Sequence, residues 1–419
     1  MTVLAGFWGV IYTFSYMDTL PMFRKGFGLG EEIAPALERD YFSSLVEWFR
    51  DHDFTLENGA TAVLLAHEFG FCYGVDRAVE YAYETRKKFP DRRIHITGEI
   101  IHNPHVNDNL RAMDIRFLST PNNLGIEMSA VDAGDVVILP AFGARIEDLD
   151  ALRDRGAVLV DTTCGSVLNV WKNVQRNARD GFTSIIHGKV AHEETRATAS
   201  WARGVKENGH YLVVRDMPET ELVCTYIEKG GDRQTFMKRF ENACSAGFDP
   251  DQHLLHLGVA NQTTMLSSES LAIAKRLGQA LQSRHGAAQQ EARFRSFDTI
   301  CSATQERQDA VIDLLQKRLD MLVVIGGYNS SNTNHLAELA HEYDTPAFHI
   351  EDAEALSEDG SIRFQPVGSE TEKEQARWLP SGTVRVGVTA GASTPNKSIG
   401  EVLTKILTLR GVTAPLKNV

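Results

Sequence analysis

Three cysteines follow apolar segments and precede stretches of helical periodicity. Cys72 comes after the apolar run at residues 62–66, and apolar side chains then recur every three or four residues from 75 to 82. The same succession recurs twice further along the chain, at 157–163, Cys164 and 167–174, and at 297–300, Cys301 and 311–315. Each pattern predicts a β-strand, a tight turn that carries the cysteine, and an amphipathic helix.

A second correspondence follows each cysteine at a nearly constant distance. Strand-like segments end in Gly98, Gly188 and Gly326, which lie 26, 24 and 25 residues after the respective cysteines. Each leads into a polar loop and a further predicted helix. Third strands are predicted at residues 136–140, 255–260 and 384–389. The chain therefore reads as three related βαβαβ units.

Strands that alternate with helices predict an α/β fold of three small parallel-sheet units. Ligands of such sheets bind beyond the carboxyl ends of the strands. All three cysteines and the polar loops lie at those ends. If the units pack around a pseudo-threefold axis, the cysteines meet at the centre, so we expect one shared site.

The domain borders follow from this repeat, and the strand before each cysteine is free to belong to a neighbouring unit. We expect an N-terminal extension, three units and a short tail, at residues 1–60, 61–159, 160–296, 297–411 and 412–419. The second unit carries a hydrophilic insertion near 228–252, and the third carries an excursion near 354–377. One helix is predicted within the extension, at residues 39–49.

Composition agrees with a globular protein of several domains. The chain has 419 residues, 42% of them hydrophobic and 24% charged, with 33 glycines and 13 prolines. These values exclude collagen, low-complexity and largely disordered chains. The net charge of −13, without any long basic run, argues against nucleic acid as a partner. An anionic ligand would need a local pocket of neutral donors, histidines and helix N-termini.

The apolar stretch at residues 1–17 precedes the first arginine, Arg24, and lacks the basic region of a signal peptide. We do not interpret this stretch as a membrane span either. A cytoplasmic protein is expected. Translation starting at Met17, with residues 1–16 as a loose tail, is one possible interpretation.

Five cysteines without an export signal indicate reduced thiols that serve as metal ligands, nucleophiles or core residues. Three converging cysteines would hold a 4Fe–4S cluster and leave one iron open to substrate. Zinc bound with a histidine is the alternative, but the short C-x2-C spacing of zinc modules is absent. Three ordinary core cysteines are the other alternative. Cys224 and Cys244 lack the strand-to-helix setting and are interpreted as structural.

Eight motifs in order resemble the LytB (IspH) family, the 4-hydroxy-3-methylbut-2-enyl diphosphate reductases. They are residues 70–75 (GFCYGV), 101–103 (IHN), 161–164 (DTTC), 192–194 (HEE), 262–264 (QTT), 300–308 (ICSATQERQ), 329–334 (NSSNTN) and 388–393 (VTAGAS). The leading segments 17–19 and 24–28, together with the two excursions, resemble the long plant and cyanobacterial branch.

The resemblance implies the last step of the methylerythritol phosphate route to isoprenoids. There the allylic alcohol diphosphate loses its hydroxyl in a two-electron, two-proton reduction to isopentenyl and dimethylallyl diphosphate. It implies one 4Fe–4S cluster on Cys72, Cys164 and Cys301, with a 3Fe–4S form after oxidation. Glu194 would supply the proton and Thr263 would relay it. The implied diphosphate pocket consists of His102, His192, Thr264, Asn329, Ser330, Ser331, Asn332 and Ser393.

The expected partners are the small-molecule diphosphate and an electron donor of the ferredoxin or flavodoxin type, since no nicotinamide-binding glycine motif follows a strand. The chain is expected to be a monomer or a homodimer. Taken singly, His102 and His192 also fit ordinary loop or N-cap positions, and residues 329–332 also fit a turn with an N-cap.

Three positions depart from the family pattern. Phe142 replaces a histidine of the short-chain members, which removes one diphosphate donor, although the long branch shares the phenylalanine. Gly165 stands where a proline commonly follows the second cysteine, and Asn396 where an aspartate is usual.

Two other functions remain as alternatives. One is a different three-cysteine 4Fe–4S enzyme such as quinolinate synthase, against which the HEE and NSSN segments argue. The other is a cluster-bearing redox regulator, for which the sequence offers no basic helix or exposed apolar stripe.

Overall fold

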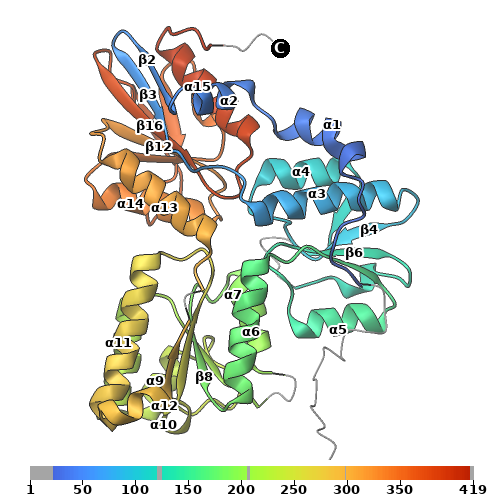
Figure 1. Cartoon of the computed structure of the whole chain (residues 1–419), viewed down its shortest axis with the longest axis vertical. Coiled ribbons are helices and arrows are strands. Elements are labelled where there is room, and N and C mark those ends of the chain that lie inside the picture. The colour runs from blue at the N-terminus through green and yellow to red at the C-terminus, as the bar shows by residue number, and fades with distance from the viewer. Residues whose placement is uncertain (1–21, 120–124, 205–207, 298, 416–419) are drawn as a thin grey trace, which may run out of the picture.

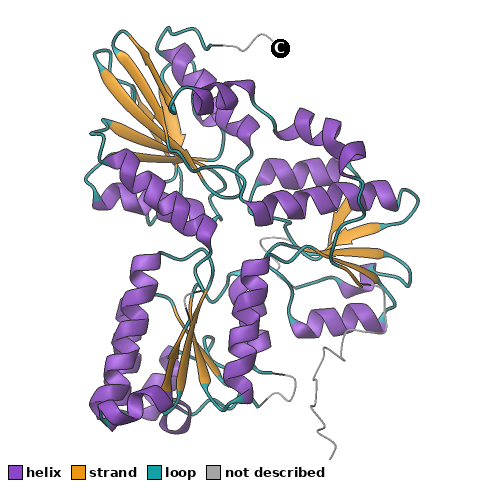
Figure 2. Cartoon of the chain, in the orientation of Figure 1, coloured by secondary structure: helices purple, strands orange, loops and turns teal. Residues whose placement is uncertain are grey.

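Three α/β lobes surround a common centre in the computed structural model of this chain (Figures 1 and 2). The structure describes residues 22–119, 125–204, 208–297 and 299–415. Each lobe has one main sheet with helices on both of its faces (Figure 2). The predicted α/β class with parallel sheets is confirmed.

The first sheet is parallel throughout and has the strand order β1-β7-β6-β4-β5. Its strands are β1 (Met22–Phe23), β4 (Ile94–Ile96), β5 (Ile115–Phe117), β6 (Val136–Leu139) and β7 (Val158–Asp161). The helices of this lobe are α3 (Tyr73–Lys88), α4 (Pro104–Ala112) and α5 (Ile146–Asp154), with the 3-10 turn η1 (Met128–Ala130).

The second sheet, also parallel, has the order β11-β10-β8-β9. Its strands are β8 (Thr183–His187), β9 (Tyr211–Val214), β10 (Leu257–Asn261) and β11 (Phe294–Ser296). Its helices are α6 (Gly165–Arg179), α7 (Glu193–Ala202), α8 (Met217–Lys229), α11 (Ser267–His285) and α12 (Gln290–Arg293), with η2 (Ala287–Gln289). The insertion expected near 228–252 contains α9 (Arg233–Arg239) and α10 (Pro250–His253).

The third sheet has the order β13-β12-β16-β3-β2, in which the edge strand β2 alone is antiparallel. Its strands are β2 (Thr55–Asn58), β3 (Thr61–Leu65), β12 (Met321–Ile325), β13 (Ala347–Ile350) and β16 (Val384–Ala390). Its helices are α13 (Ser302–Leu315), α14 (Ser331–Glu342) and α15 (Asn396–Leu409). The excursion near 354–377 forms the hairpin of β14 (Ser361–Phe364) and β15 (Lys373–Ala376), preceded by η3 (Ala353–Ala355).

The central strands of the sheets are buried on both faces. Every residue of β3, β8, β10 and β12 is buried. Such continuous burial is typical of parallel strands covered by helices on both sides. Each sheet therefore has a core on both faces, and the polar loops collect at the strand ends.

The strand before each cysteine pairs in the sheet of the neighbouring lobe. β3 pairs with β16 of the third lobe, β7 with β6 of the first, and β11 with β10 of the second. This arrangement was left open by the sequence, and it means that residue 61, the expected start of the first unit, begins a strand of the third sheet. The other predicted borders remain predictions.

The strand before Cys301, predicted at residues 297–300, lies earlier in the chain. It is β11 of the second sheet, which ends at Ser296. Further along, the Thr299 hydroxyl accepts the Asn261 N–H at 2.8 Å, so a side chain takes over a bond that a backbone ladder would otherwise make.

The single helix predicted at residues 39–49 is wrong. Two helices, α1 (Gly30–Tyr41) and α2 (Ser44–Asp51), are separated by Phe42 and Ser43 in extended conformation. The Ser43 hydroxyl accepts the Val46 N–H at 3.3 Å and so caps α2. The cap makes a new helix start more favourable than continuation of α1. α1 packs on α3 and α15, and α2 packs on α15.

The predictions about Met17 and residues 1–16 lie outside the described residues, as does the end of the 412–419 tail. Among the helices that the structure describes, none has the length and apolarity needed to cross a bilayer.

Replacing the cap residue tests the junction between α1 and α2. Ser43→Ala is expected to lower the free energy of unfolding by about 1 kcal/mol, because the Val46 N–H loses its acceptor. Urea unfolding followed by circular dichroism measures this. Ser44→Ala, one residue inside the helix, is the control and should leave stability nearly unchanged; equal losses would show that the cap has no special role.

Candidate active site

The three cysteines occupy equivalent positions in the three lobes. Cys72, Cys164 and Cys301 are the N-cap residues of α3, α6 and α13. Their backbone N–H groups donate to carbonyls that follow strands of the neighbouring sheets, at Ala392 (3.2 Å), Ala141 (3.0 Å) and Thr263 (3.2 Å), respectively. Each thiol is thereby attached to a strand end and to the N-terminus of a helix, where peptide dipoles favour negative charge.

The sulfur atoms share one region. A Cβ added to Gly74 would stand 2.6 Å from Cys164 Sγ and 4.0 Å from Cys72 Sγ, so only glycine leaves room for both thiols. The pKa of Cys301 is raised to about 11, mainly by burial, with contributions from the neighbouring Cys72 and Glu194. The pKa of Cys72 is also raised, mainly by burial, with a contribution from Cys164. All three cysteines are free and partly buried.

Arg307 lies beside this region and was given no role by the sequence. Its guanidinium donates to the carbonyls of Gly70 (2.7 Å) and Phe71 (3.2 Å), just before Cys72. The side chain is buried, and its charge opposes the effect of burial on the pKa of Cys72. An arginine among the apolar positions of the predicted helix is the signal that could have identified it.

Glu194 is buried and held by one neighbour. Its carboxylate accepts the Thr263 N–H at 2.6 Å and the Thr263 hydroxyl at 3.0 Å. Burial raises the pKa of Glu194 to about 7, although the two bonds from Thr263 act in the opposite direction. At neutral pH a large fraction of Glu194 therefore carries a proton, next to Cys301.

His192 presents a hydrogen-bond donor to the site. As N-cap of α7, its Nδ1 accepts the Glu194 N–H at 3.2 Å. Burial, His102 and Lys189 lower the pKa of His192 well below its usual value, so the ring is neutral. Because Nδ1 is the acceptor, the single ring hydrogen is on Nε2. The N-cap interpretation and the binding interpretation of this residue are thus compatible.

His102 is fixed on three sides. Its Nδ1 lies 2.8 Å from Glu99 Oε2, and the same carboxylate oxygen accepts Asn329 Nδ2–H at 2.9 Å. The Ser393 hydroxyl donates to the His102 carbonyl at 3.1 Å. The ring of Phe142 stacks on His102, with centroids 4.2 Å apart. Phe142 stands where the short-chain members of the family carry a histidine. Here its ring packs against the His102 imidazole.

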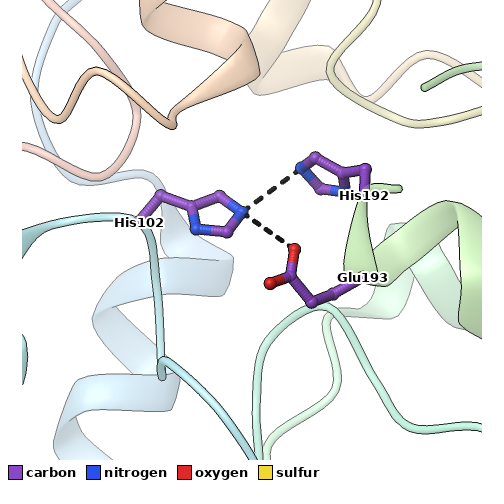
Figure 3. Close-up of side chains that lie close together, drawn as sticks. All are labelled: His102, His192 and Glu193. Atoms are coloured by element: carbon purple, nitrogen blue, oxygen red, sulfur yellow. Dashed lines mark hydrogen bonds and ion pairs between the residues drawn. The ribbon is translucent and has the colours of Figure 1, made fainter. Parts of the chain in front are cut away.

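The Nε2 atoms of His102 and His192 lie 3.3 Å apart, and His102 Nε2 lies 3.5 Å from Glu193 Oε2 (Figure 3). Spacing alone would allow the three residues to hold a metal ion. The hydrogen on His192 Nε2 makes this nitrogen a donor, whereas a metal needs its lone pair. The arrangement suits an anion better than a cation.

The loop before α14 supplies hydroxyls and amides. Ser330 caps α14 by accepting from Thr333, so the N-cap interpretation holds for it. Ser331 Oγ contacts His335 Nε2 at 3.3 Å. Asn332 Oδ1 accepts the Ala392 N–H at 2.9 Å, while its buried Nδ2 has no partner in the described part of the chain. A buried amide donor without a partner indicates room for a ligand oxygen.

Thr264 lies in the same loop as Thr263 and accepts Gln262 Nε2–H at 2.9 Å. Cys224 and Cys244 lie elsewhere, in the core of the second lobe and against it. The structure adds Glu99, Glu193 and Arg307 to the residues predicted from the sequence.

Residues 63–407 match the sequence model described as LytB protein. A curated relative from Synechococcus sp. (strain WH7803), named 4-hydroxy-3-methylbut-2-enyl diphosphate reductase, is 51% identical over 387 residues, 92% of this chain and 95% of the relative. The chain belongs to the LytB family. A relative of the same name from Thermosynechococcus vestitus is 48% identical over 389 residues, 93% of this chain and 95% of the relative.

Solved structures agree with membership of the LytB family. The structure titled (E)-4-hydroxy-3-methyl-but-2-enyl diphosphate reductase, the terminal enzyme of the non-mevalonate pathway, is 26% identical with a TM-score of 0.50 and covers 83% of this chain and 99% of its own. The Plasmodium falciparum reductase shares the fold at 19% identity, with a TM-score of 0.61 over 84% of this chain and 91% of its own. The resemblance of the motifs to the LytB family is confirmed.

Proposed function

We propose that this chain reduces 4-hydroxy-3-methylbut-2-enyl diphosphate to isopentenyl and dimethylallyl diphosphate in the region where the three lobes meet. The observation that carries this is the buried Glu194 carboxyl, held by Thr263 and lying beside Cys301, with donor side chains nearby. The reaction needs two electrons, two protons and the departure of the hydroxyl as water. The relatives' names describe the same substrate.

The residues present fit an iron–sulfur cluster held by Cys72, Cys164 and Cys301. A Cβ on Gly74 would lie against the sulfurs of Cys72 and Cys164. Cys301 is close enough to Cys72 for the charge of Cys72 to raise its pKa. A 4Fe–4S cluster with three protein ligands would supply electrons and an open Lewis-acidic iron. The charge of Arg307 beside Cys72 favours the thiolate form that a ligand requires.

The diphosphate would be bound by uncharged donors in a protein of net charge −13. His192 Nε2–H and the unpartnered Asn332 Nδ2 are two of these donors. The N-termini of α7 and α14 add backbone N–H groups and favourable dipoles. Asn329, Ser330, Ser331, Thr264 and Ser393 complete the proposed pocket around His102.

Glu194 would give its proton to the departing hydroxyl. The raised pKa keeps the acid form available near neutral pH. Thr263 holds the carboxyl in place through its N–H, and its hydroxyl, which contacts Glu194 Oε2, would relay the proton to the substrate oxygen. A ferredoxin or flavodoxin would supply the electrons, to a monomer or homodimer in the cytoplasm.

Anaerobic turnover tests the reaction. Purified holoprotein with reduced methyl viologen should oxidise the dye when 4-hydroxy-3-methylbut-2-enyl diphosphate is added, and both five-carbon diphosphates should form. If protein that holds four irons and four sulfides does not turn over, the reductase proposal is wrong. Quinolinate synthase activity is then the next assay.

Gly74→Ala tests the cluster ligands. The added methyl group meets Cys164 Sγ, so we expect loss of most bound iron, although alanine is the better helix former. Iron content and the visible absorption spectrum measure this, and circular dichroism checks the fold. Gly165→Ala is the matched control, since nothing lies within 4 Å of its added Cβ. Equal iron in both variants would contradict the assignment.

Glu194→Gln tests the proton donor. The amide cannot release a proton to the leaving oxygen, so kcat should fall by about 100- to 10,000-fold. The Kd for inorganic pyrophosphate, measured by calorimetry, should change less than about twofold, because the pocket is otherwise intact. Glu241→Gln removes an exposed carboxylate elsewhere and should retain full turnover. A Glu194→Gln enzyme of normal kcat would exclude this role.

A further inference from the structure

Glu193 and its neighbour Glu194 have different surroundings. Glu194 is buried against Thr263, whereas the Glu193 side chain is 34% exposed and extends toward His102 (Figure 3). Its carboxylate contacts His102 Nε2 at 3.5 Å. The proposed reaction makes no use of this carboxylate.

His102 lies between two carboxylates. Glu99 binds Nδ1 at 2.8 Å and is held in place by Asn329, so this contact belongs to the framework of the site. Glu193 faces the opposite nitrogen, which is directed to the proposed diphosphate pocket. An incoming anion must share or replace that contact, because two anions at one imidazole nitrogen repel each other.

The Glu193 oxygen occupies the position expected of a ligand oxygen. It lies within 4.8 Å of the Nε2 atoms of both His102 and His192, which are the two ring nitrogens facing the pocket. His192 Nε2 carries a hydrogen and lies 3.3 Å from His102 Nε2. The Glu193 carboxylate therefore stands where the two imidazoles face the pocket, and the chain places its own anion there.

A small cavity beside Glu193 offers room for its carboxylate. Glu193 is the first residue of α7, and Arg196 lies one turn further on the same face. The cavity is lined by Glu193, Arg196 and Arg145. Rotation of the Glu193 side chain toward these cations would remove its charge from His102 without any backbone movement.

We propose that Glu193 is an internal competitor of the diphosphate, whose carboxylate stays beside His102 Nε2 in the pocket until a sufficiently charged ligand displaces it. The inference rests on the proposed function, since it concerns the same pocket. It makes Glu193 a specificity-determining residue. A diphosphate displaces the carboxylate, whereas singly charged anions such as chloride or a monophosphate ester bind too weakly to do so.

Binding of inorganic pyrophosphate to the full-length holoenzyme tests the proposal by calorimetry. Glu193→Gln should lower the Kd by about five- to tenfold, because a like charge near the phosphate is removed. The KM for the substrate should fall similarly. Discrimination between pyrophosphate and inorganic phosphate should decrease.

Two further variants separate this contact from general charge effects. Glu193→Asp keeps the acidic group in the first turn of α7 but shortens its reach to His102, so the Kd should lie between those of the wild type and Glu193→Gln. Glu342→Gln removes an exposed carboxylate at the end of α14 and should leave the Kd unchanged. Unchanged or weaker pyrophosphate binding by Glu193→Gln would overturn the proposal.

The outcomes also separate this inference from the proposed reaction. Wild-type turnover combined with an unchanged Kd in Glu193→Gln would reject only the role of Glu193. A lower Kd in Glu193→Gln combined with absence of turnover in the wild type would retain the anion site and reject the reductase reaction.

Discussion

The three backbone hydrogen bonds from the cysteines to neighbouring strand ends are the constraint on which the site depends. Each cysteine follows a strand that pairs in the sheet of another lobe, and its N–H donates to a carbonyl that follows the partner strand. Each thiol is therefore tied by a backbone hydrogen bond to the strand end of a neighbouring sheet. Gly74 then provides the space in which two of the sulfurs approach.

Electrostatics in this protein are local. The whole chain is acidic, yet the centre combines neutral donors with a buried carboxyl whose pKa is raised to about 7. Burial is the first cause of the raised pKa of Glu194 and of the lowered pKa of His192. The same desolvation thus prepares one group to donate a proton and the other to donate a neutral hydrogen bond.

Periodicity and motif spacing predicted the α/β class, the three repeats and the strand-to-helix position of each cysteine. The sequence could not predict which sheet receives the strand before a cysteine, because pairing partners depend on tertiary contacts. It missed the break at Ser43, since one side-chain cap outweighed a continuous helical pattern. Glu99 and Glu193 were missed because their roles arise from proximity to His102, whereas Arg307 had a signal in its place among apolar positions.

The pairing of β3 with β16 also has a consequence for biosynthesis. The apolar strand β3 leaves the ribosome about 320 residues before its partner β16. At translation rates of roughly 5 to 20 residues per second, β3 waits on the order of 15 to 60 seconds with an unpaired edge. The third sheet therefore closes only after nearly the whole chain has emerged, so the nascent protein depends on protection of an exposed strand for most of its synthesis.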